Sequence, residues 1–192
     1  FVLSSKVGRL ITPARAGSVD AGLYKDPPPF EATMDYGYDA TMRSLEDSMQ
    51  RLGLNSIDLV FIHDLDRGQH GDQLPKRFEE AMAGAHKALV ELREQKVIKG
   101  FGLGVNEWQV AQQFIDHGDP DCFLLAGRYT LLEQEALNSF LPLCEQRDVD
   151  VVIGGPYNSG VLATGAVAGA HYNYQPANAE VLDRVNRIEV IC

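Results

Sequence analysis

The sequence predicts an α/β fold in which parallel strands alternate with helices. Short runs rich in Val, Ile, Leu and Phe occur five times, and strands buried on both faces have this composition. Between them lie longer stretches whose apolar residues recur at helical spacing. The 192 residues, 45% of them hydrophobic and 23% charged, suffice for a single domain with a sizeable core, which we expect to span residues 1–192. The predicted strands are Phe1–Ser5, Ile57–His63, Gly100–Val105, Cys122–Ala126 and Val149–Ile153.

Amphipathic stretches between these runs predict the helices. In the first, Met42, Leu45, Met49 and Leu52 form an apolar stripe expected to face the sheet, and Gly53 is placed to end the helix. Three further stretches repeat the pattern, and Pro142 suits the first turn of a shorter helix. These three helices are predicted over residues 78–92, 110–115 and 181–188.

The connection after the first strand is unusually long. Residues 10–36 are rich in Pro and Gly and show no helical pattern, so they predict a loop. Both an open doubly wound sheet and a closed (β/α)8 barrel fit the alternation of strands and helices. A barrel takes roughly 250 residues, about 31 per unit, so five units account for about 155 residues and the loop for most of the remainder. In a barrel, about three strands would lie outside this chain, and its start within an apolar run at Phe1 agrees with that expectation.

Composition narrows the range of partners. With 17 Lys and Arg against 27 Asp and Glu, the net charge is −10, which argues against a nucleic-acid-binding surface. No run of about 18 apolar residues predicts a membrane span. Cys122, Cys144 and Cys192 lack metal-type spacing, and their odd number favours reduced thiols in the cytoplasm. We therefore expect a small-molecule substrate, while the oligomeric state stays open.

Polar residues at the ends of three predicted strands are candidates for catalysis, because reactive groups of parallel α/β folds gather at the carboxyl ends of strands. Lys6 follows the first strand, His63 ends the second and Asn106 follows the third. Lys6 taken alone is better explained as a solvated cation at a strand end, because lysines are mostly exposed. His63 also fits a core histidine bonded to a backbone carbonyl.

Two other patterns carry weaker signals. His63, Asp64 and Asp66 include residue types that bind metals, but adjacent strand residues point to opposite faces, so no metal site is expected. The stretch Gly154–Gly165 is rich in glycine but lacks the spacing of known phosphate-binding loops. It is either a plain loop or a site that binds phosphate through backbone amides.

The strand ends taken together resemble the aldo-keto reductase superfamily over essentially the whole chain. Residues 1–6, Phe-Val-Leu-Ser-Ser-Lys, resemble the third barrel strand, which ends in the catalytic lysine of that family. Residues 58–63, Asp-Leu-Val-Phe-Ile-His, resemble the fourth strand with its active-site histidine. Residues 99–106, Lys-Gly-Phe-Gly-Leu-Gly-Val-Asn, resemble the fifth, whose Asn contacts the nicotinamide carboxamide. The resemblance implies strands three to seven of a (β/α)8 barrel, with Lys6 and His63 as catalytic residues.

Two stretches, residues 125–132 and 153–162, resemble the branch of D-threo-aldose 1-dehydrogenases, which act on L-fucose or L-galactose and have pyridoxal 4-dehydrogenase as a close relative. The resemblance implies NAD or NADP as cofactor and oxidation of an aldose at C1 to a lactone. In that chemistry Lys6 lowers the pKa of a tyrosine and His63 donates a hydrogen bond to the substrate oxygen. Trp108 is a candidate for lining the substrate pocket, although a packing role explains it better. The cofactor-binding residues implied are Asn106, Gly154, Pro156, Asn158, Ser159, Gly160 and Leu162.

The sequence also departs from the family pattern. Ala126 and Gly154 stand where most members carry a Gln that binds the carboxamide and a Tyr that stacks on the nicotinamide. The catalytic Tyr, its Asp partner and the eighth strand are expected outside this chain. Three alternatives remain: a reductase of aldehydes, ketones or pyridoxal that uses NADPH, a cofactor-binding barrel without catalysis, and an unrelated metal-dependent barrel hydrolase.

Overall fold

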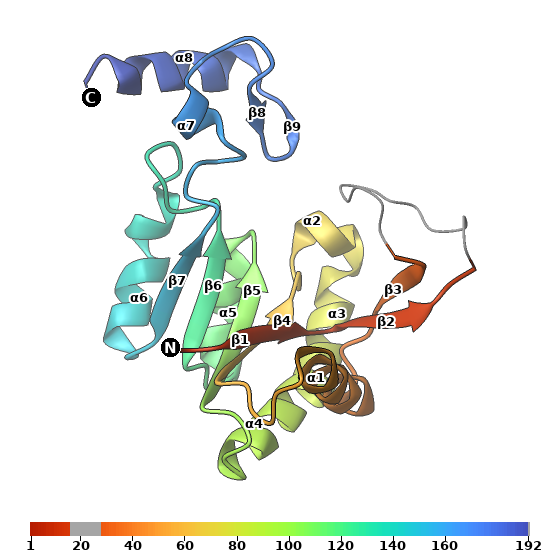
Figure 1. Ribbon diagram of the computed structural model, residues 1–192. Helices are drawn as coiled ribbons and strands as arrows, with labels where there is room; N and C mark the ends of the chain where they lie inside the picture. Colours follow the sequence, from red (N-terminus) through yellow and green to blue (C-terminus); the bar gives the residue numbers. More distant parts are fainter. Residues whose placement is uncertain (16–27, 192) are drawn as a thin grey trace. The chain divides into compact units, whose positions relative to one another are not determined.

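A computed structural model describes residues 1–15 and 28–191, and it contains a sheet of five parallel strands (Figure 1). The strand order is β1-β4-β5-β6-β7, the sequential order of a (β/α)8 barrel segment rather than a doubly wound sheet. The predicted fold class is therefore confirmed. The strands are β1 (Ser4–Val7), β4 (Leu59–His63), β5 (Gly100–Val105), β6 (Cys122–Ala126) and β7 (Asp150–Gly154).

The chain divides into two compact units, Phe1–Gly102 and Leu103–Cys192. The boundary falls inside β5, and each unit is described by itself below. The expectation of a single domain over residues 1–192 stays a prediction.

The first strand lies three residues later than the sequence predicts. Parallel pairing of β1 with β4 begins at Ser4 opposite Leu59 and continues to Val7 opposite Ile62. Phe1 and Val2 precede this pairing and are exposed. The prediction of a strand over Phe1–Ser5 is wrong at both ends, because the position of the partner strand decides where the ladder starts.

Helix α1 (Tyr38–Leu52) ends at Gly53 as predicted, with Gly53 in the left-handed conformation at φ 64°. Its buried face differs from the predicted stripe: Leu45 is buried, but Thr41, Ser44 and Ser48 are buried beside it, and Leu52 is exposed. The hydroxyls of Thr41 and Ser48 tolerate burial because they are bonded: Thr41 Oγ1 donates to the Gly37 carbonyl and Ser48 Oγ to the Ser44 carbonyl, each at 2.9 Å.

The helix predicted over residues 78–92 is present but interrupted. It consists of α3 (Leu74–Ala81), a π-helical turn η2 (Met82–His86) and α4 (Lys87–Glu94). The backbone N–H of Ala85 donates to the carbonyl of Tyr36 at 2.7 Å. A Cβ at Gly84 would lie 2.5 Å from that same carbonyl oxygen, so only glycine allows this close approach.

The region predicted as a loop over residues 10–36 contains two strands, which corrects that prediction. Strands β2 (Arg9–Pro13) and β3 (Phe30–Met34) pair antiparallel as a separate ribbon. Residues 16–27 of the predicted loop lie outside the described residues. After β4 come two short helical segments, α2 (Arg67–His70) and η1 (Gly71–Gln73).

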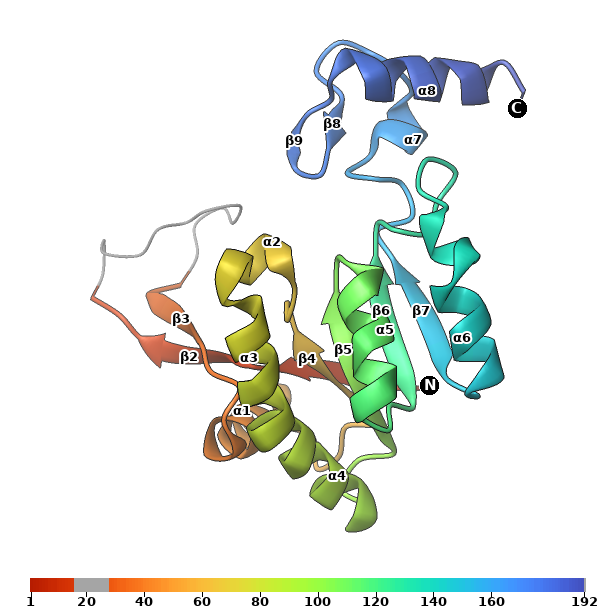
Figure 2. The ribbon, with the colours of Figure 1, turned by 180° about the vertical axis from the view of Figure 1, so that it is seen from behind.

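In the second unit, α5 (Trp108–His117) and α6 (Phe140–Gln146) cover one face of the strands (Figure 2). Phe123 of β6 lies between them, with ring centroids 6.4 Å from Phe114 of α5 and 5.5 Å from Phe140 of α6. Both helices were predicted, and Pro142 lies in the first turn of α6. A short 3-10 helix, η3 (Glu135–Asn138), precedes α6.

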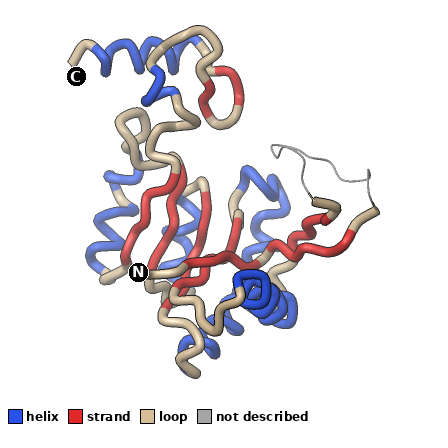
Figure 3. The backbone as a smooth tube through the Cα atoms, in the orientation of Figure 1, coloured by secondary structure: helices blue, strands red, loops and turns tan. Residues whose placement is uncertain are grey.

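After β7 the chain forms a small layer of its own: α7 (Val161–Thr164), the hairpin β8 (His171–Tyr172) and β9 (Gln175–Pro176), and α8 (Ala179–Glu189) (Figure 3). Helix α8 confirms the predicted helix over residues 181–188, and the Asn178 side chain caps its start by accepting from Val181 N–H at 2.9 Å. The apolar cluster beneath comprises Leu132, Val161, Ala170, Val181 and Val185.

Candidate active site

Lys6 and His63 lie on one face of the paired strands β1 and β4. Lys6 is opposite Phe61 in the parallel register, and His63 follows Phe61 by two residues, so their side chains share a face. Ser5 points to the other face, where its Oγ lies 3.4 Å from Ser48 Oγ of α1. Lys6 and His63 therefore occupy the face turned away from α1, at the carboxyl ends of adjacent strands.

An ion pair lies beside His63. Arg9 of β2 donates from Nη2 to Asp64 Oδ2 at 2.7 Å, and His63 Nε2 lies 3.3 Å from the same oxygen. Asp64 has φ 49°, a left-handed backbone that is uncommon for a residue other than glycine. The bend directs the Asp64 carboxylate back to the histidine that precedes it, although adjacent residues in a regular strand would point apart.

The pKa of His63 is lowered from 6.5 to about 4. Burial is the main cause, and the positive charges of Lys6 and Arg9 add to it. His63 is therefore neutral near pH 7. A neutral imidazole donates one hydrogen bond and accepts another, which suits a group that binds an uncharged substrate oxygen.

Tyr36 supports the strand end that carries His63. Its side chain is fully buried, and its hydroxyl donates to the His63 carbonyl at 2.8 Å. His70 Nε2 lies 2.8 Å from the same hydroxyl; because the phenolic hydrogen is already used, His70 must donate from Nε2. Burial, with the negative charges of Asp64 and Asp66, raises the pKa of Tyr36. Tyr36 is thus a structural contact and not a proton donor tuned to neutral pH.

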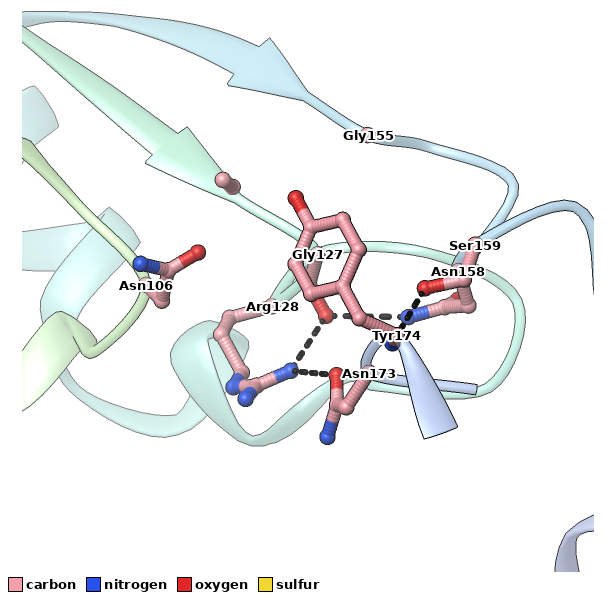
Figure 4. A pocket seen from close by; sticks show the side chains of 9 residues that line it. Asn106, Gly127, Arg128, Gly155, Asn158, Ser159, Asn173 and Tyr174 are labelled. Carbon is pink, nitrogen blue, oxygen red and sulfur yellow. Dashed lines mark hydrogen bonds between the residues drawn. The ribbon is translucent and has the colours of Figure 1, made fainter. Parts of the chain in front are cut away.

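The second unit contains a pocket of about 50 Å³ at the carboxyl ends of β5 and β6 (Figure 4). Asn106, Asn158 and Ser159, all predicted to bind a cofactor, line it together with Ala126 and Gly127. The Gly127 N–H donates to the Gly154 carbonyl at 2.8 Å, which ties the loops after β6 and β7 together. Further lining residues are Arg128, Gly155, Asn173 and Tyr174.

Four other residues of the predicted cofactor set, Gly154, Pro156, Gly160 and Leu162, lie outside the lining of this pocket in the described part of the chain. The backbone N–H groups of Gly160 and Leu162 both donate to the Tyr157 carbonyl, at 3.0 and 3.2 Å. Because these amides are used inside the turn, they do not form a phosphate cradle in this conformation. Their assignment to the cofactor stays a prediction.

Two further positions bear on the predicted site. Trp108 begins α5 and is partly buried, and its place in a substrate pocket stays a prediction. Gly154 pairs with Ala126 across β6 and β7, and a Cβ at Gly154 would lie 3.5 Å from the Ala126 Cβ. The two small residues are thus neighbours across β6 and β7; their correspondence to a Gln and a Tyr of the family stays a prediction.

Three further features concern metal binding, membrane-spanning helices and the cysteines. Among residues 1–15 and 28–191, no group of three or more His, Cys, Asp or Glu is arranged to hold a metal ion. No helix in the described ranges is both long and apolar enough to cross a membrane. Cys122 and Cys144 are buried free thiols, and burial raises the pKa of each to about 11; Cys192 lies outside the described residues.

Sequence reasoning missed several polar residues around both sites. Arg9 directly precedes the predicted loop and Tyr36 is its last residue, and neither showed a periodic signal. Asn173 and Tyr174 both have positive φ, 48° and 64°, and form the two-residue turn of the β8–β9 hairpin. Asparagine in a short turn between two-residue strands is a signal that could have found this hairpin.

This chain is similar in sequence to two named dehydrogenases and in fold to a solved aldo-keto reductase. The chain is 43% identical to pyridoxal 4-dehydrogenase of Microbacterium luteolum and 32% identical to D-threo-aldose 1-dehydrogenase of a Pseudomonas species. Each match covers all of this chain, which spans 59% and 57% of those two proteins. An aldo-keto reductase from Bacillus halodurans, solved in its holo form, matches in fold with a TM-score of 0.63 and 22% identity over 90% of this chain and 49% of that one.

The pattern of the Aldo/keto reductase family matches residues 2–192, which is nearly the whole chain. That match agrees with the sequential parallel strands and with the residues at the strand ends. The protein therefore belongs to the aldo/keto reductase family.

Proposed function

We propose that the protein is an NAD(P)-dependent oxidoreductase that oxidises an aldose at C1 to the lactone. The observation that carries the proposal is the family match over residues 2–192, together with Lys6 and His63 on one face at the carboxyl ends of adjacent strands. Relatives named as dehydrogenases support the oxidative direction.

His63 and Lys6 have distinct roles in this proposal. Neutral His63 donates a hydrogen bond to the substrate oxygen, which replaces the 3.3 Å contact of Nε2 with Asp64 Oδ2. Lys6 supplies a positive charge on the same face, which favours the deprotonated form of an acid beside it. In this proposal that acid is a tyrosine.

The residues present fit a nicotinamide cofactor, which supplies a hydride acceptor at C4 of its ring. The pocket of the second unit offers side-chain amides from Asn106 and Asn158 and a hydroxyl from Ser159. Gly154 and Ala126, neighbours across β6 and β7, present no bulky side chain at these strand ends. Both NAD and NADP agree with these residues.

Pyridoxal is the second candidate substrate, favoured by the 43% identity to a pyridoxal 4-dehydrogenase. Like an aldose, pyridoxal closes on its own hydroxyl to form a cyclic hemiacetal, so its oxidation also gives a lactone. The two candidates therefore require the same chemistry at the reacting carbon and differ in the rest of the molecule.

Steady-state assays with L-fucose, L-galactose, D-arabinose and pyridoxal, each with NAD and with NADP, test the proposal. We expect cofactor reduction with at least one sugar, and a loss of about 10²-fold or more in kcat for Lys6→Met and His63→Gln. Oxidation of pyridoxal alone would replace the sugar by the second candidate. Reduction of simple aldehydes by NADPH without sugar oxidation would contradict the oxidative assignment, and tight NAD(P)H binding without turnover would show a cofactor-binding barrel. Cell fractionation tests the expected cytoplasmic location.

A further inference from the structure

The pocket at the ends of β5 and β6 contains a buried polar atom that its surroundings do not satisfy. Asn158 is 3% exposed, and its Nδ2 donates to the Gly127 carbonyl at 3.1 Å. Its Oδ1 is buried and has no hydrogen-bond partner among the described residues. Buried polar atoms are nearly always bonded, so this oxygen points to a group that binds there.

The orientation of the Asn158 amide is fixed by its neighbours. The Gly127 carbonyl oxygen is an acceptor, and it also accepts from Arg128 Nη1 at 3.1 Å. Turning the amide round would place two acceptors, Asn158 Oδ1 and the Gly127 oxygen, against each other. The donor nitrogen therefore faces Gly127, and the carbonyl oxygen is left for a ligand.

The other walls of the pocket supply donors. Arg128 is held by the Asn173 side chain, whose Oδ1 accepts from Nη1 at 3.2 Å. Ser159 Oγ accepts from the Tyr174 N–H at 3.0 Å, which leaves its own hydroxyl hydrogen to donate. Figure 4 shows Arg128, Asn158 and Ser159 around the same space, with Asn106, which directly follows β5, across from them.

We propose that this pocket binds a neutral group that both donates and accepts hydrogen bonds, and that Asn158 Oδ1 accepts from it. The volume of about 50 Å³ holds roughly three water molecules, which corresponds to a group of about three non-hydrogen atoms. The pyrophosphate of a dinucleotide carries no hydrogen for Asn158 Oδ1, and it is larger than a group of about three non-hydrogen atoms, so it does not fit. Building on the proposed function, two sources have the required chemistry: the carboxamide of the nicotinamide and a hydroxymethyl group of the sugar.

Two pairs of ligands distinguish the two sources, because in each pair only one member carries the hydrogen that Asn158 Oδ1 would accept. In the cofactor arm, the dissociation constant of NADH is compared with that of reduced acetylpyridine adenine dinucleotide, in which a methyl group replaces the amide nitrogen. In the substrate arm, kcat/KM for L-galactose is compared with that for L-fucose, the same sugar without its terminal hydroxyl. Wild-type protein is expected to prefer the hydrogen-bonding member by about tenfold in one arm.

Two variants show whether Asn158 makes this distinction. Asn158→Gly tolerates the left-handed backbone at φ 47° and should abolish the preference. Arg128→Met removes the other side-chain donor to the Gly127 carbonyl, so it controls for loosening of the loop, and it should keep the preference. The proposal is overturned if the preference in both arms is the same in wild type and Asn158→Gly, because Asn158 would then act only through Gly127.

A direct readout separates this proposal from the proposed function. The Asn158 side-chain amide resonance, assigned by its absence in Asn158→Gly, is followed by NMR while nicotinamide mononucleotide or L-galactose is added. A saturable shift with one ligand supports the pocket even if the protein shows no turnover. Without a shift for either ligand the pocket assignment fails, whatever the activity.

Discussion

Replacing Tyr36 by Phe removes one hydroxyl that makes two contacts in the core of the first unit. The ring is fully buried, so Phe fills the same space. The hydroxyl donates to the His63 carbonyl at 2.8 Å and accepts from His70 Nε2 at 2.8 Å. The carbonyl would be left buried without this donor, at a cost of about 1–3 kcal/mol. His70 is only partly buried, so water replaces its contact. We expect Tyr36→Phe to lower the free energy of unfolding by about 2 kcal/mol.

Urea unfolding followed by circular dichroism measures this loss. With an m-value of about 2 kcal/mol/M, the midpoint should fall by about 1 M. Tyr38→Phe is the matched control, because the partly exposed Tyr38 hydroxyl donates to Glu91 Oε2 at 2.7 Å and water can replace this contact. The reasoning is refuted if Tyr36→Phe costs less than about 0.5 kcal/mol, the range of ordinary surface substitutions, or no more than the control.

Three further predictions follow from the same region. Lys6→Met should raise the pKa of His63 above about 4, because the Lys6 charge helps to lower it. An NMR titration of the His63 imidazole measures this pKa. Lys99→Met is the control: it removes an ion pair to Asp58 and should leave the pKa of His63 unchanged. Because the pKa of folded His63 lies below its ordinary 6.5, the unfolded chain is protonated first as pH falls. Its contribution to stability is thus complete above pH 6.5 and lost toward pH 4, by roughly 3 kcal/mol. The free energy of unfolding should therefore fall between pH 6.5 and pH 4 by about this much more in wild type than in His63→Gln, and an equal fall in both would count against it. Gly84→Ala should cost about 1–3 kcal/mol, since its Cβ would lie 2.5 Å from the Tyr36 carbonyl oxygen; equal or higher thermal stability would show that the contact relaxes freely.

The strands buried on both faces were the most predictable part of the chain. The predicted bounds of β5 and β6 match the structure, since continuous apolar runs such as the fully buried β5 leave one interpretation. The first strand was misplaced because the start of β4 opposite Ser4 determines its pairing. Apolar residues at Phe1 and Val2 carry no information about that partner.

The errors in the first unit arise from tertiary contacts. The buried stripe of α1 includes Thr41 and Ser48, whose polar hydroxyls are hydrogen-bonded to backbone carbonyls of the same segment. The β2–β3 ribbon was read as part of a loop because Pro13 and the prolines before Phe30 interrupt it, and proline is tolerated at ribbon ends. Local propensity predicts neither feature.

For the candidate sites, sequence identified the strand-end residues but not their surroundings. Lys6, His63 and Asn106 follow from the rule that reactive groups lie at the carboxyl ends of parallel strands. Arg9 and Asp64 meet only because Asp64 adopts a left-handed backbone. Asn173 reaches Arg128 from 45 residues away through a hairpin that the glycine-rich stretch did not predict.

The central claim is that this family member moves a hydride from the hemiacetal carbon of its substrate to a nicotinamide with the help of Lys6 and His63. The most direct test incubates the protein with NAD or NADP and either L-fucose or pyridoxal that carries deuterium at the reacting carbon, and then analyses the cofactor by mass spectrometry. We predict that the reduced cofactor gains one deuterium with wild-type protein and none with His63→Gln over the same time. Undeuterated cofactor from both substrates, or equal transfer by wild type and His63→Gln, would contradict the account.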